Sequence, residues 1–378
     1  MSNPATEQIF DVIVVGGGVM GAATTLALSK AGKKTLLIDQ FEPPHSHGSS
    51  HGQTRLLRVA YAEGEKFVPI VRRAIDLWKE LERDAGQDIF RQTGVVYAGS
   101  PNSTFISSAL ESARSHDVDI KEVDRSSSGK QRNFRAVPED WSIFQEREGG
   151  YLLVEASVSV MIASALKKGA STQFGQKVIA IEEASQTVRV KTESGTFEAG
   201  AAVVAAGPWV SDLVPLIGNK TQVQRKLLHW YEADSSFDAC GDFQPFAFND
   251  ERGDEWFYGF PAVDGFGVKV ADHRFGQDID NPDDLDRSIH ASDVDHMDDL
   301  VSRFFPMLGP RTKSAVCMYT STENEDFLMD RVPGSDKVFV CAGFSGHGYK
   351  FATAIGEVMA NLATDEPVAF DIAPFRVA

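Results

Sequence analysis

The chain has 378 residues, more than the ~100 to 200 of a typical single domain, so we expect two structural units. Its 37 basic and 54 acidic residues give a formal net charge of -17, and a surface of that sign repels nucleic-acid phosphates and anionic lipids. Hydrophobic residues make up 42% of the chain, but no run approaches the ~18 apolar residues of a membrane helix. These numbers exclude a small binding module and argue against nucleic-acid and membrane partners.

The cysteines and the N-terminus bear on location and metal binding. Cys240, Cys317 and Cys341 cannot all pair with one another and lack the close spacing of a metal site. The N-terminus lacks the basic and then apolar regions of a secretory signal. We therefore expect a cytoplasmic protein without a metal centre.

The N-terminal residues predict a strand, a glycine-rich turn, a helix and a second strand. Residues 10–15 are typical of a buried strand, residues 22–31 of a helix that Gly32 ends, and residues 35–38 of the next strand. A βαβ unit of about thirty residues is characteristic of dinucleotide-binding folds.

The turn of this unit matches the pattern G-x-G-x-x-G at Gly16, Gly18 and Gly21. Gly16 permits the tight turn, Gly18 lets a pyrophosphate approach the backbone, and Gly21 lets the helix pack closely on the strand. Asp39, at the end of the second strand, is the acidic residue that the motif needs; a solvated strand end is the alternative for this residue. We predict a dinucleotide site rather than a merely structural turn.

The following segments predict a polar loop, a scaffold helix and an excursion. Residues 43–52 are rich in turn formers and too poor in apolar residues for a strand or helix. Apolar residues then recur at helical spacing around Trp78, which we expect in the core rather than on a cofactor. Residues 86–149, with a serine- and charge-rich link at 125–135, are interpreted as an excursion from the first fold.

The second half of the chain predicts a return to that fold and then a second sheet. The aromatic-rich segments 256–260 and 265–270 favour strands of an antiparallel or mixed sheet. The acidic run 278–299 lacks the glycine and closing glutamate of a calcium loop, so we expect a solvated helix and loop. The return itself is expected as a helix at 158–168 and strands at 177–182, 188–192 and 201–206.

The C-terminal segment repeats the order of the N-terminal unit. Residues 338–342 predict a strand, residues 343–348 a glycine-rich turn, and residues 349–363 an amphipathic helix. The N-terminus of this helix favours negative charge, and an electron-rich ring edge is a suitable partner for it.

Four segments together carry a resemblance to a known family. They are the dinucleotide motif with Asp39, the segment S-H-G-Q-T-R-L-L-R at 50–58, C-M-Y-T at 317–320 and G-F-S-G-H-G-Y-K-F at 343–351. With these segments the chain resembles the monomeric sarcosine oxidase and N-methyltryptophan oxidase family, FAD-dependent amine oxidases of the D-amino-acid-oxidase-like superfamily. The similarity runs in order from about Phe10 to Phe375.

The resemblance implies an α/β fold of two interleaved domains. A Rossmann-type FAD-binding domain would comprise residues 1–88, 150–218 and 320–378. An α+β substrate domain, containing a mixed and largely antiparallel sheet, would comprise residues 89–149 and 219–319.

The resemblance also implies FAD joined at its 8α-methyl carbon to the sulfur of Cys317. His51 and Arg55 match family positions beside the flavin ring, and a nearby cation favours the thiolate that attachment requires. Gly346 and Gly348 fall in the second cofactor turn. Without the motif, Cys317 would be read as a small buried thiol and His51 as an ordinary loop histidine.

The family positions for the substrate are Arg58 and Lys350, on an amino-acid carboxylate, and Tyr258 and Tyr319, lining the pocket. Arg offers a planar fork to a carboxylate and Lys adds a point charge. A lysine at a helix N-terminus opposes the helix dipole and so favours an anionic partner. A surface Arg58, a helix-start Lys350 and ordinary packed tyrosines are the alternatives.

Two further residues match the catalytic sheet of the family. Lys269 alternates with Val268 and Val270, so its ammonium points away from them, and a fixed positive charge favours the reduction of dioxygen. His273 matches the position that tunes the charge of the bound amine. The alternatives are an edge-strand lysine and a solvated loop histidine.

The sequence departs from the family pattern in two places. Residues 324–326, Asn-Glu-Asp before Phe327, replace the usual acidic residue, Glu and His, and residues 246–256 do not closely match either named enzyme. Both departures leave the identity of the substrate open.

The function implied by the resemblance is an oxidase of secondary amino acids that uses dioxygen. Its products would be an imine, hydrolysed to amine and aldehyde, and hydrogen peroxide, and the enzyme would act as a monomer. A dehydrogenase of the same fold that passes electrons to a carrier, and a flavin-binding module without activity, are the alternatives. A nicotinamide-linked dehydrogenase is disfavoured by the His- and Arg-rich loop and by the second glycine turn.

Overall fold

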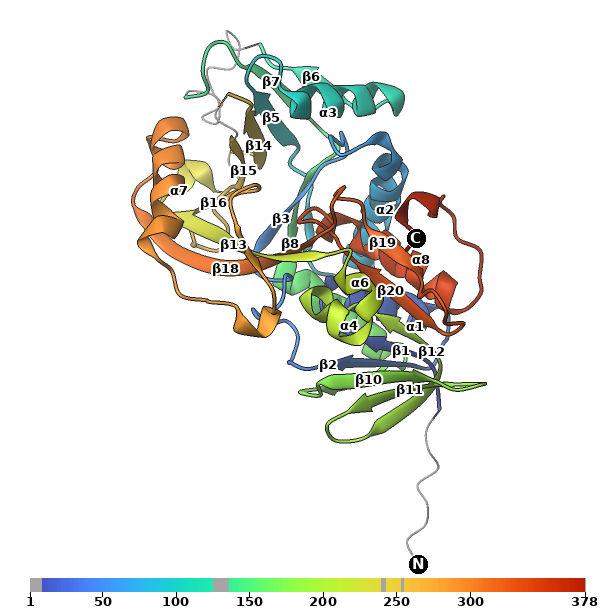
Figure 1. Ribbon diagram of the computed structural model, residues 1–378. Coiled ribbons are helices and arrows are strands. Elements are labelled where there is room, and N and C mark those ends of the chain that lie inside the picture. Colours follow the sequence, from blue (N-terminus) through green and yellow to red (C-terminus); the bar gives the residue numbers. More distant parts are fainter. Residues whose placement is uncertain (1–8, 125–135, 239–242, 253–254, 378) are drawn as a thin grey trace, which may run out of the picture.

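The structure, a computed structural model, describes residues 9–124, 136–238, 243–252 and 255–377 (Figure 1). The serine-rich link expected at residues 125–135 and Cys240 lie outside the described residues. Among the described helices, none combines the length and apolarity needed to cross a membrane. No group of three or more His, Cys, Asp or Glu side chains in the described ranges is arranged to hold a metal ion.

The first sheet is built from the two ends of the chain and a central segment. Its order is β10-β11-β12-β1-β2-β9, and β20 pairs in parallel with the second half of β12 and antiparallel with β19. The strands β12, β1, β2 and β9 are parallel neighbours, as in a Rossmann-type sheet. Its strands are β1 (Phe10–Val15), β2 (Thr35–Asp39), β9 (Ser171–Phe174), β10 (Val178–Glu183), β11 (Val188–Thr192), β12 (Thr196–Val204), β19 (Leu328–Arg331) and β20 (Val338–Ala342).

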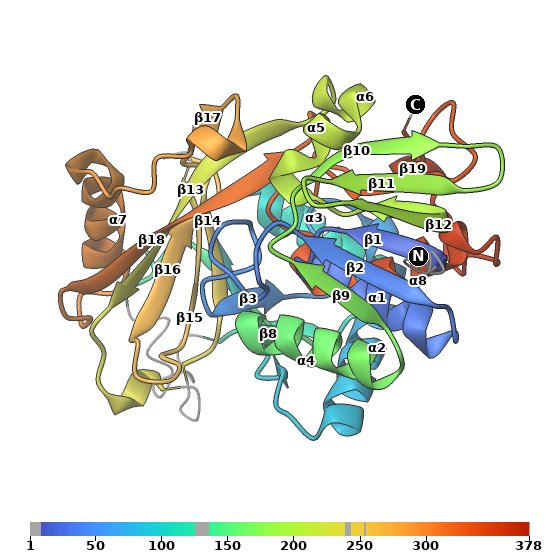
Figure 2. The same cartoon turned by 90° about the horizontal axis from the view of Figure 1, so that it is seen from below.

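Strand alternation sends the two faces of this sheet into two cores. Val12 and Val14 of β1 pack with the helices on one face, whereas Ile13 and Val15 pack against β10, β11 and the short helices on the other. Figure 2 shows α1 and α4 on one side of the sheet and α5 and α6 on the other. The helices are α1 (Val19–Lys30), α2 (Val68–Ala85), α4 (Val154–Lys167), α5 (Val210–Leu213), α6 (Pro215–Gly218) and α8 (Ala352–Ala363).

The second sheet is mixed and largely antiparallel. Its order is β17-β13-β16-β15-β14-β5-β7-β6, β18 also pairs with β13, and only the β14–β5 pair is parallel among these described strands. The helix α7 packs its Met297 and Leu300 on one face, against the phenylalanines of β14 and β15. The elements are β5 (Val95–Gly99), α3 (Thr104–Ser115), β6 (Ile120–Glu122), β7 (Ser142–Glu146), β13 (Gln222–Tyr231), β14 (Phe246–Asp250), β15 (Glu255–Phe260), β16 (Val268–Asp272), β17 (Gln277–Ile279), α7 (Ala291–Phe304) and β18 (Arg311–Ser321).

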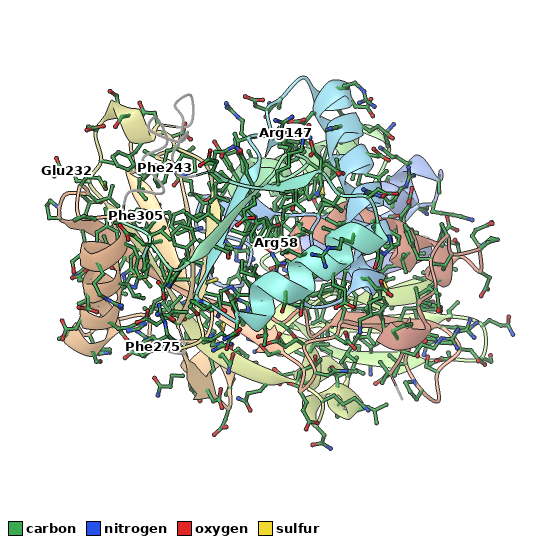
Figure 3. The ribbon with its side chains drawn as sticks, turned by 90° about the horizontal axis from the view of Figure 1, so that it is seen from above. Arg58, Arg147, Glu232, Phe243, Phe275 and Phe305 are labelled. Atoms are coloured by element: carbon green, nitrogen blue, oxygen red, sulfur yellow. The ribbon has the colours of Figure 1, made fainter. Side chains whose placement is uncertain are left out.

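A three-stranded sheet connects the two larger ones. It consists of β3 (Thr54–Leu57), β8 (Gly150–Leu153) and β4 (Phe90–Arg91), with β8 in the middle. In Figure 2 it lies between the two layers. Because β3 leads from the polar loop towards Arg58, this small sheet carries one of the expected site residues to the centre of the molecule, where Figure 3 shows Arg58.

Several elements lie as expected, and their limits differ for local reasons. Trp78 is fully buried in α2, so its assignment to the core is correct. The strand expected at 265–270 begins only at Val268, because Gly265 and Gly267 adopt φ of 77° and 86° in the preceding turn. The acidic run holds α7 and exposed loops, as expected.

Candidate active site

A cavity of about 350 Å³ lies where the two glycine turns meet the loop after β2. Its lining includes seven of the residues singled out from the sequence. It is also lined by Cys341, Ser49 and the segment Met318–Thr320 of β18. The seven residues are Gly16, Gly18, Asp39, Arg55, Tyr319, Gly346 and Gly348.

The glycines of the first turn are required by close backbone contacts. A Cβ on Gly16 would lie 2.3 Å from the carbonyl oxygen of Ala205, and a Cβ on Gly21 would lie 1.7 Å from the carbonyl oxygen of Gly16. Neither distance is possible for a real side chain. Gly21 therefore allows the helix to pack against the strand, while Gly16 and Gly18 form the wall of the cavity.

Asp39 holds the first turn in place from the end of β2. Its carboxylate accepts hydrogen bonds from Gly17 N at 2.5 Å and from Phe41 N at 2.7 Å, and the residue is buried. The side chain lines the cavity as well. The carboxylate therefore connects the glycine turn to the following loop and keeps lone pairs available for a ligand.

The second glycine turn packs against the tyrosine of the C-M-Y-T segment. Gly346 has φ of 74°, and a Cβ on it would lie 2.1 Å from the ring of Tyr319. Only glycine fits here, so the turn after β20 and the strand β18 are fixed relative to each other.

The loop that contains His51 is clamped from two sides. Glu155, in the first turn of α4, accepts hydrogen bonds from Gly52 N at 2.8 Å and from Gln53 N at 3.1 Å. From the opposite side, Lys269 Nζ donates to Gly52 O at 2.7 Å and to Thr54 O at 2.8 Å. The loop is thus held between a helix of one layer and a central strand of the other.

Lys269 and His51 are both buried at this clamp. Lys269 is 1% exposed on β16, which lies between β13 and β15, so the edge-strand alternative is wrong. Burial and the nearby Arg55 lower the pKa of Lys269 well below its usual value, whereas its oxygen acceptors stabilise the charged form. Burial lowers the pKa of His51 to about 3, and its Nε2 has no hydrogen-bond partner among the described residues.

Arg55 brings its guanidinium to Cys317. Its Nη2 donates to Ser49 O at 2.8 Å and lies 3.7 Å from Cys317 Sγ, and its Nη1 donates to Thr54 O at 2.9 Å. Cys317 is 1% exposed on β18. Cys341 lines the cavity, whereas Cys317 is not among its lining residues, and burial raises the pKa of the Cys341 thiol to about 12. Of these two buried thiols, Cys317 is the one in contact with a cation.

Arg58 forms a buried ion pair with Glu63. The two side chains are 5% and 8% exposed, and the Arg58 guanidinium also lies over the rings of Tyr61 and Phe105. Burial alone would raise the pKa of Glu63, but Arg58 outweighs it and lowers that pKa to about 2. The carboxylate that Arg58 meets in this structure is therefore one of the chain's own.

Lys350 is buried beside this pair and has neutral partners. Its Nζ donates to His347 O at 2.6 Å and to the Tyr61 hydroxyl at 3.2 Å. Burial lowers the pKa of Lys350 well below its usual value, as does Arg58, while Glu63 opposes them. The indole of Trp78 donates to Lys350 O at 2.9 Å, so the scaffold helix α2 fixes the backbone that presents this lysine.

An aromatic wall leads from Arg58 to the two tyrosines of the second sheet. Phe105 contacts both Arg58 and Trp256, and the Trp256 ring lies 4.1 Å from that of His273. The His273 ring lies 5.6 Å from that of Tyr319, whose hydroxyl is 3.1 Å from the hydroxyl of Tyr258. Burial lowers the pKa of His273 to about 3, so this imidazole is neutral at pH 7.

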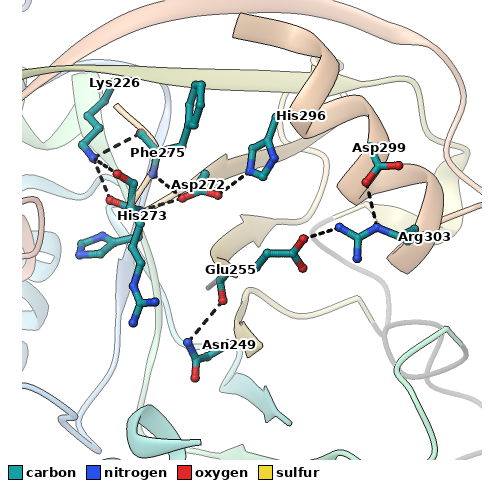
Figure 4. A network of polar contacts seen from close by, with 10 residues as sticks. Lys226, Asn249, Glu255, Asp272, His273, Phe275, His296, Asp299 and Arg303 are labelled. Atoms are coloured by element: carbon teal, nitrogen blue, oxygen red, sulfur yellow. Dashed lines mark hydrogen bonds and ion pairs between the residues drawn. The ribbon is translucent and has the colours of Figure 1, made fainter. Parts of the chain in front are cut away.

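The turn that carries His273 is fixed by a third buried lysine, Lys226, shown in Figure 4. Lys226 Nζ donates to the carbonyl oxygens of His273, Arg274 and Phe275 at 2.9, 3.0 and 3.3 Å. Asp272 Oδ1 accepts from the backbone N–H groups of Arg274 and Phe275, each at 2.7 Å. Together these contacts hold the turn after β16 in one conformation.

A family model described as FAD dependent oxidoreductase matches residues 11–362. The chain belongs to this family. Among its curated relatives are the N-methyl-L-tryptophan oxidases of Escherichia coli (strain K12) and Yersinia pestis (strain Pestoides F). Each is 36% identical over 371 residues, which cover 98% of this chain and 99% of the relative.

Solved structures of other oxidases share the fold of this FAD dependent oxidoreductase. The open form of NikD, an unusual amino acid oxidase essential for nikkomycin biosynthesis, matches with a TM-score of 0.85 at 21% identity, covering 98% of this chain and 97% of NikD. Glycine oxidase from Geobacillus kaustophilus matches with a TM-score of 0.80 at 19% identity and covers 98% of both chains. The fold class expected from the sequence is therefore confirmed.

The residues of this FAD dependent oxidoreductase fit the cofactor of its family. The cavity joins two glycine turns, the buried carboxylate of Asp39, and the N-terminus of α1, where Gly18 provides no side-chain cap. Such a helix end stabilises phosphate groups. The expected cofactor, FAD, and the expected class of enzyme, an FAD-dependent oxidoreductase, are both confirmed by the family.

The structure also shows buried residues around the candidate site that the sequence patterns did not indicate. Glu63 and Glu155 hold Arg58 and the His51 loop. Glu146, fully buried on β7, accepts from Val59 N, Ala60 N and the Tyr97 hydroxyl. Their partners lie in other elements, and the chain shows no local pattern around them. Only Tyr61 and His347 could have been found, because they lie next to or within the motifs.

Proposed function

We propose that this FAD-dependent enzyme is an oxidase of secondary amino acids, N-methylated or cyclic. The observation that carries the proposal is the buried pair of cations, Arg58 and Lys350, at one end of an aromatic wall that reaches the cofactor cavity at Tyr319. Buried cations without a surplus of carboxylates favour an anionic ligand. The relatives that oxidise N-methyl-L-tryptophan support the same class of substrate.

In this proposal, Arg58 and Lys350 bind the carboxylate of the substrate. Arg58 offers two parallel N–H donors and Lys350 a point charge. Glu63 now occupies Arg58, so the incoming carboxylate must displace it or share the guanidinium with it. The rings of Trp256, Tyr258 and Tyr319 then enclose the rest of the substrate and exclude water.

The net reaction removes two electrons and two protons from the C–N unit. When bound, FAD would supply the acceptor for the electron pair, and dioxygen, as the final oxidant, would take up two electrons and two protons and leave as hydrogen peroxide. An acyclic imine adds water and separates into amine and aldehyde, whereas a cyclic imine stays one molecule. Neutral His273 places no second positive charge beside the amine, and the ammonium of Lys269 stabilises the negative charge that develops on dioxygen.

The proposal has four further parts. Arg55 Nη2 lies 3.7 Å from the sulfur of Cys317, which would join the cofactor covalently. His51 and Arg55 would lie beside the flavin ring, as their family positions suggest. The two-domain division at the boundaries given above is retained. The family resemblance supports a monomer, and the cysteine usage supports a cytoplasmic location.

The test is turnover of the FAD-loaded enzyme with N-methyl-L-tryptophan, sarcosine and L-proline under air. We expect one hydrogen peroxide for each amino acid consumed, with formaldehyde released from the two N-methyl substrates. Arg58→Ala should raise KM at least ~100-fold, since a charged hydrogen bond of this kind is worth about 3 kcal/mol.

The same experiment separates the alternatives. Substrate consumption without peroxide, but with reduction of an added electron carrier, would identify a dehydrogenase. If no amino acid bleaches the flavin absorbance anaerobically, the proposal of an amine oxidase is wrong.

A further inference from the structure

The surroundings of Lys350 contain two polar residues to which the proposed function gives no role. Tyr61 is fully buried and His347 is 5% exposed, and both contact Lys350 directly. The rings of Phe67, Phe327 and Phe351 enclose them. Polar groups in such an apolar cluster need hydrogen bonds of defined direction.

The direction of these hydrogen bonds follows from the acceptor at one end. His347 Nε2 lies 2.9 Å from the carbonyl oxygen of Glu325, and a carbonyl can only accept, so Nε2 carries a proton. Burial lowers the pKa of His347 to about 4, against the opposing effect of Glu63, so the imidazole is neutral at pH 7. Its Nδ1 is then an acceptor.

The Tyr61 hydroxyl connects the imidazole of His347 to the lysine. The Tyr61 hydroxyl lies 2.6 Å from His347 Nδ1 and must donate its only hydrogen there. Its lone pairs are left for Lys350 Nζ, which donates at 3.2 Å. The order Lys350, Tyr61, His347, Glu325 O is thus a chain in which every group donates to the next.

We propose that Tyr61 and His347 are positioning residues for Lys350, which hold its ammonium so that one N–H remains for the carboxylate of the substrate. When Lys350 is protonated to bind a carboxylate, its Nζ has three N–H groups, and Tyr61 and the His347 carbonyl occupy two of them within the described structure. The Tyr61 ring also lies under both cations, 5.1 Å from Lys350 Nζ and 4.5 Å from Arg58 Cζ. This inference rests on the proposed carboxylate site and adds the residues that orient it.

The test measures equilibrium binding of two unreactive probes to the FAD-loaded enzyme, by the change in flavin absorbance. Indole-3-acetate has the carboxylate without the amine, and indole-3-acetamide replaces the carboxylate by a neutral amide. Tyr61→Phe and His347→Leu should weaken the acid ~5- to 10-fold, the value of one hydrogen bond, and leave the amide unchanged. His347→Asn, which keeps an acceptor near the Nδ1 position, should bind the acid like the wild type.

Two controls separate positioning from a structural effect. Tyr231→Phe removes another buried tyrosine hydroxyl, which donates to Asp298 on α7, and should change the binding of neither probe. In a Lys350→Met background, Tyr61→Phe should cause no further loss, because Tyr61 acts through the lysine.

The outcomes are distinct. Equal weakening of acid and amide in Tyr61→Phe and His347→Leu, or losses that add in the Lys350→Met background, would overturn the positioning role. Unchanged binding of the acid in both variants would do the same. If the wild type itself does not prefer the acid to the amide, the proposed carboxylate site is wrong, and that result is independent of Tyr61.

Discussion

The buried lysines of this enzyme are satisfied mainly by neutral oxygens. Lys226 and Lys269 each donate to backbone carbonyls, and Lys350 donates to a carbonyl and a hydroxyl. A carbonyl stabilises an ammonium without cancelling its charge, so the positive field of the lysine is preserved for a ligand. Arg58 differs because the carboxylate of Glu63 neutralises its guanidinium. Glu63 therefore affects how strongly Arg58 can bind the carboxylate of a substrate.

Glu63 should compete with the substrate for Arg58. In Glu63→Gln, the guanidinium no longer faces a carboxylate, so we expect KM for the amino acid to fall ~10-fold, with a smaller change in kcat. The free energy of unfolding should fall by about 3 kcal/mol, because a buried charge loses its partner. Steady-state kinetics and urea unfolding measure the two effects. Glu357→Gln, which breaks an exposed pair with Arg73, serves as the control, and a rise in KM in Glu63→Gln would show that Glu63 assists binding.

Cys317 and Cys341 provide a matched pair for testing the covalent bond. Both thiols are buried near the cavity, but only Cys317 lies beside the Arg55 guanidinium. We expect the acid-precipitated wild type and Cys341→Ala to remain yellow, and Cys317→Ala to release all flavin into the supernatant. Absorbance of pellet and supernatant measures the distribution. Yellow colour retained by Cys317→Ala would assign attachment elsewhere.

At the scale of elements, the sequence predicted what depends on local patterns. The strand, glycine turn and helix at each end of the chain follow from apolar periodicity and from glycines that only a close backbone contact explains, such as Gly16. The sequence predicted that the second sheet is antiparallel or mixed, but not the order in which its strands pair. The parallel pairing of β14 with β5 joins residues about 150 positions apart, and no local pattern encodes it.

The segment after β3 depends on Glu146 of β7 for its position. Its carboxylate accepts from Val59 N at 2.9 Å and Ala60 N at 2.9 Å, the two residues that follow Arg58. Glu146→Gln turns one acceptor into a donor, so we expect a loss of about 2 kcal/mol in unfolding free energy and a KM raised ~10-fold with a smaller effect on kcat.

The control for this variant is Glu82→Gln. Glu82 also accepts from two backbone N–H groups, Ile89 N at 2.8 Å and Phe90 N at 2.7 Å, but holds the connection between α2 and β4. It should lose comparable stability and keep its KM. Equal changes of KM in both variants would mean that Glu146 acts on the whole fold and not on Arg58.

At the scale of the molecule, the site depends on contacts that the sequence does not show. The motifs supplied Arg58, Lys269 and Lys350, because each lies in a recognisable segment. The sequence did not indicate Glu63, which pairs with Arg58, or Glu155 and Glu146, which hold the backbone near these cations. An isolated glutamate is usually a surface residue, and its burial is decided only when distant elements pack. In a chain with 54 acidic residues and a net charge of -17, a single glutamate does not by itself indicate a buried site residue.

The same packing makes the stability of the whole molecule sensitive to acid. Burial lowers the pKa of His51 and His273 to about 3 and that of His229 and His347 to about 4, whereas an exposed imidazole in the unfolded chain titrates near ~6.5. Below that pH the unfolded chain binds protons that the folded chain does not. The free energy of unfolding should therefore fall from pH ~6.5 towards 4 by up to about 1.4 kcal/mol per pH unit for each imidazole.

Urea unfolding midpoints between pH 7.5 and 5 measure this dependence. His229 lies on β13, where its Nδ1 meets Ser314 Oγ at 2.9 Å, and it belongs to neither the cavity nor the cation pair. His229→Gln should therefore give a shallower loss of stability below pH 6.5 while leaving KM unchanged. A midpoint that stays constant down to pH 5 would mean that these imidazoles are protonated in the folded state. His347 could then not be the neutral acceptor that the hydrogen bonds from Lys350 through Tyr61 require.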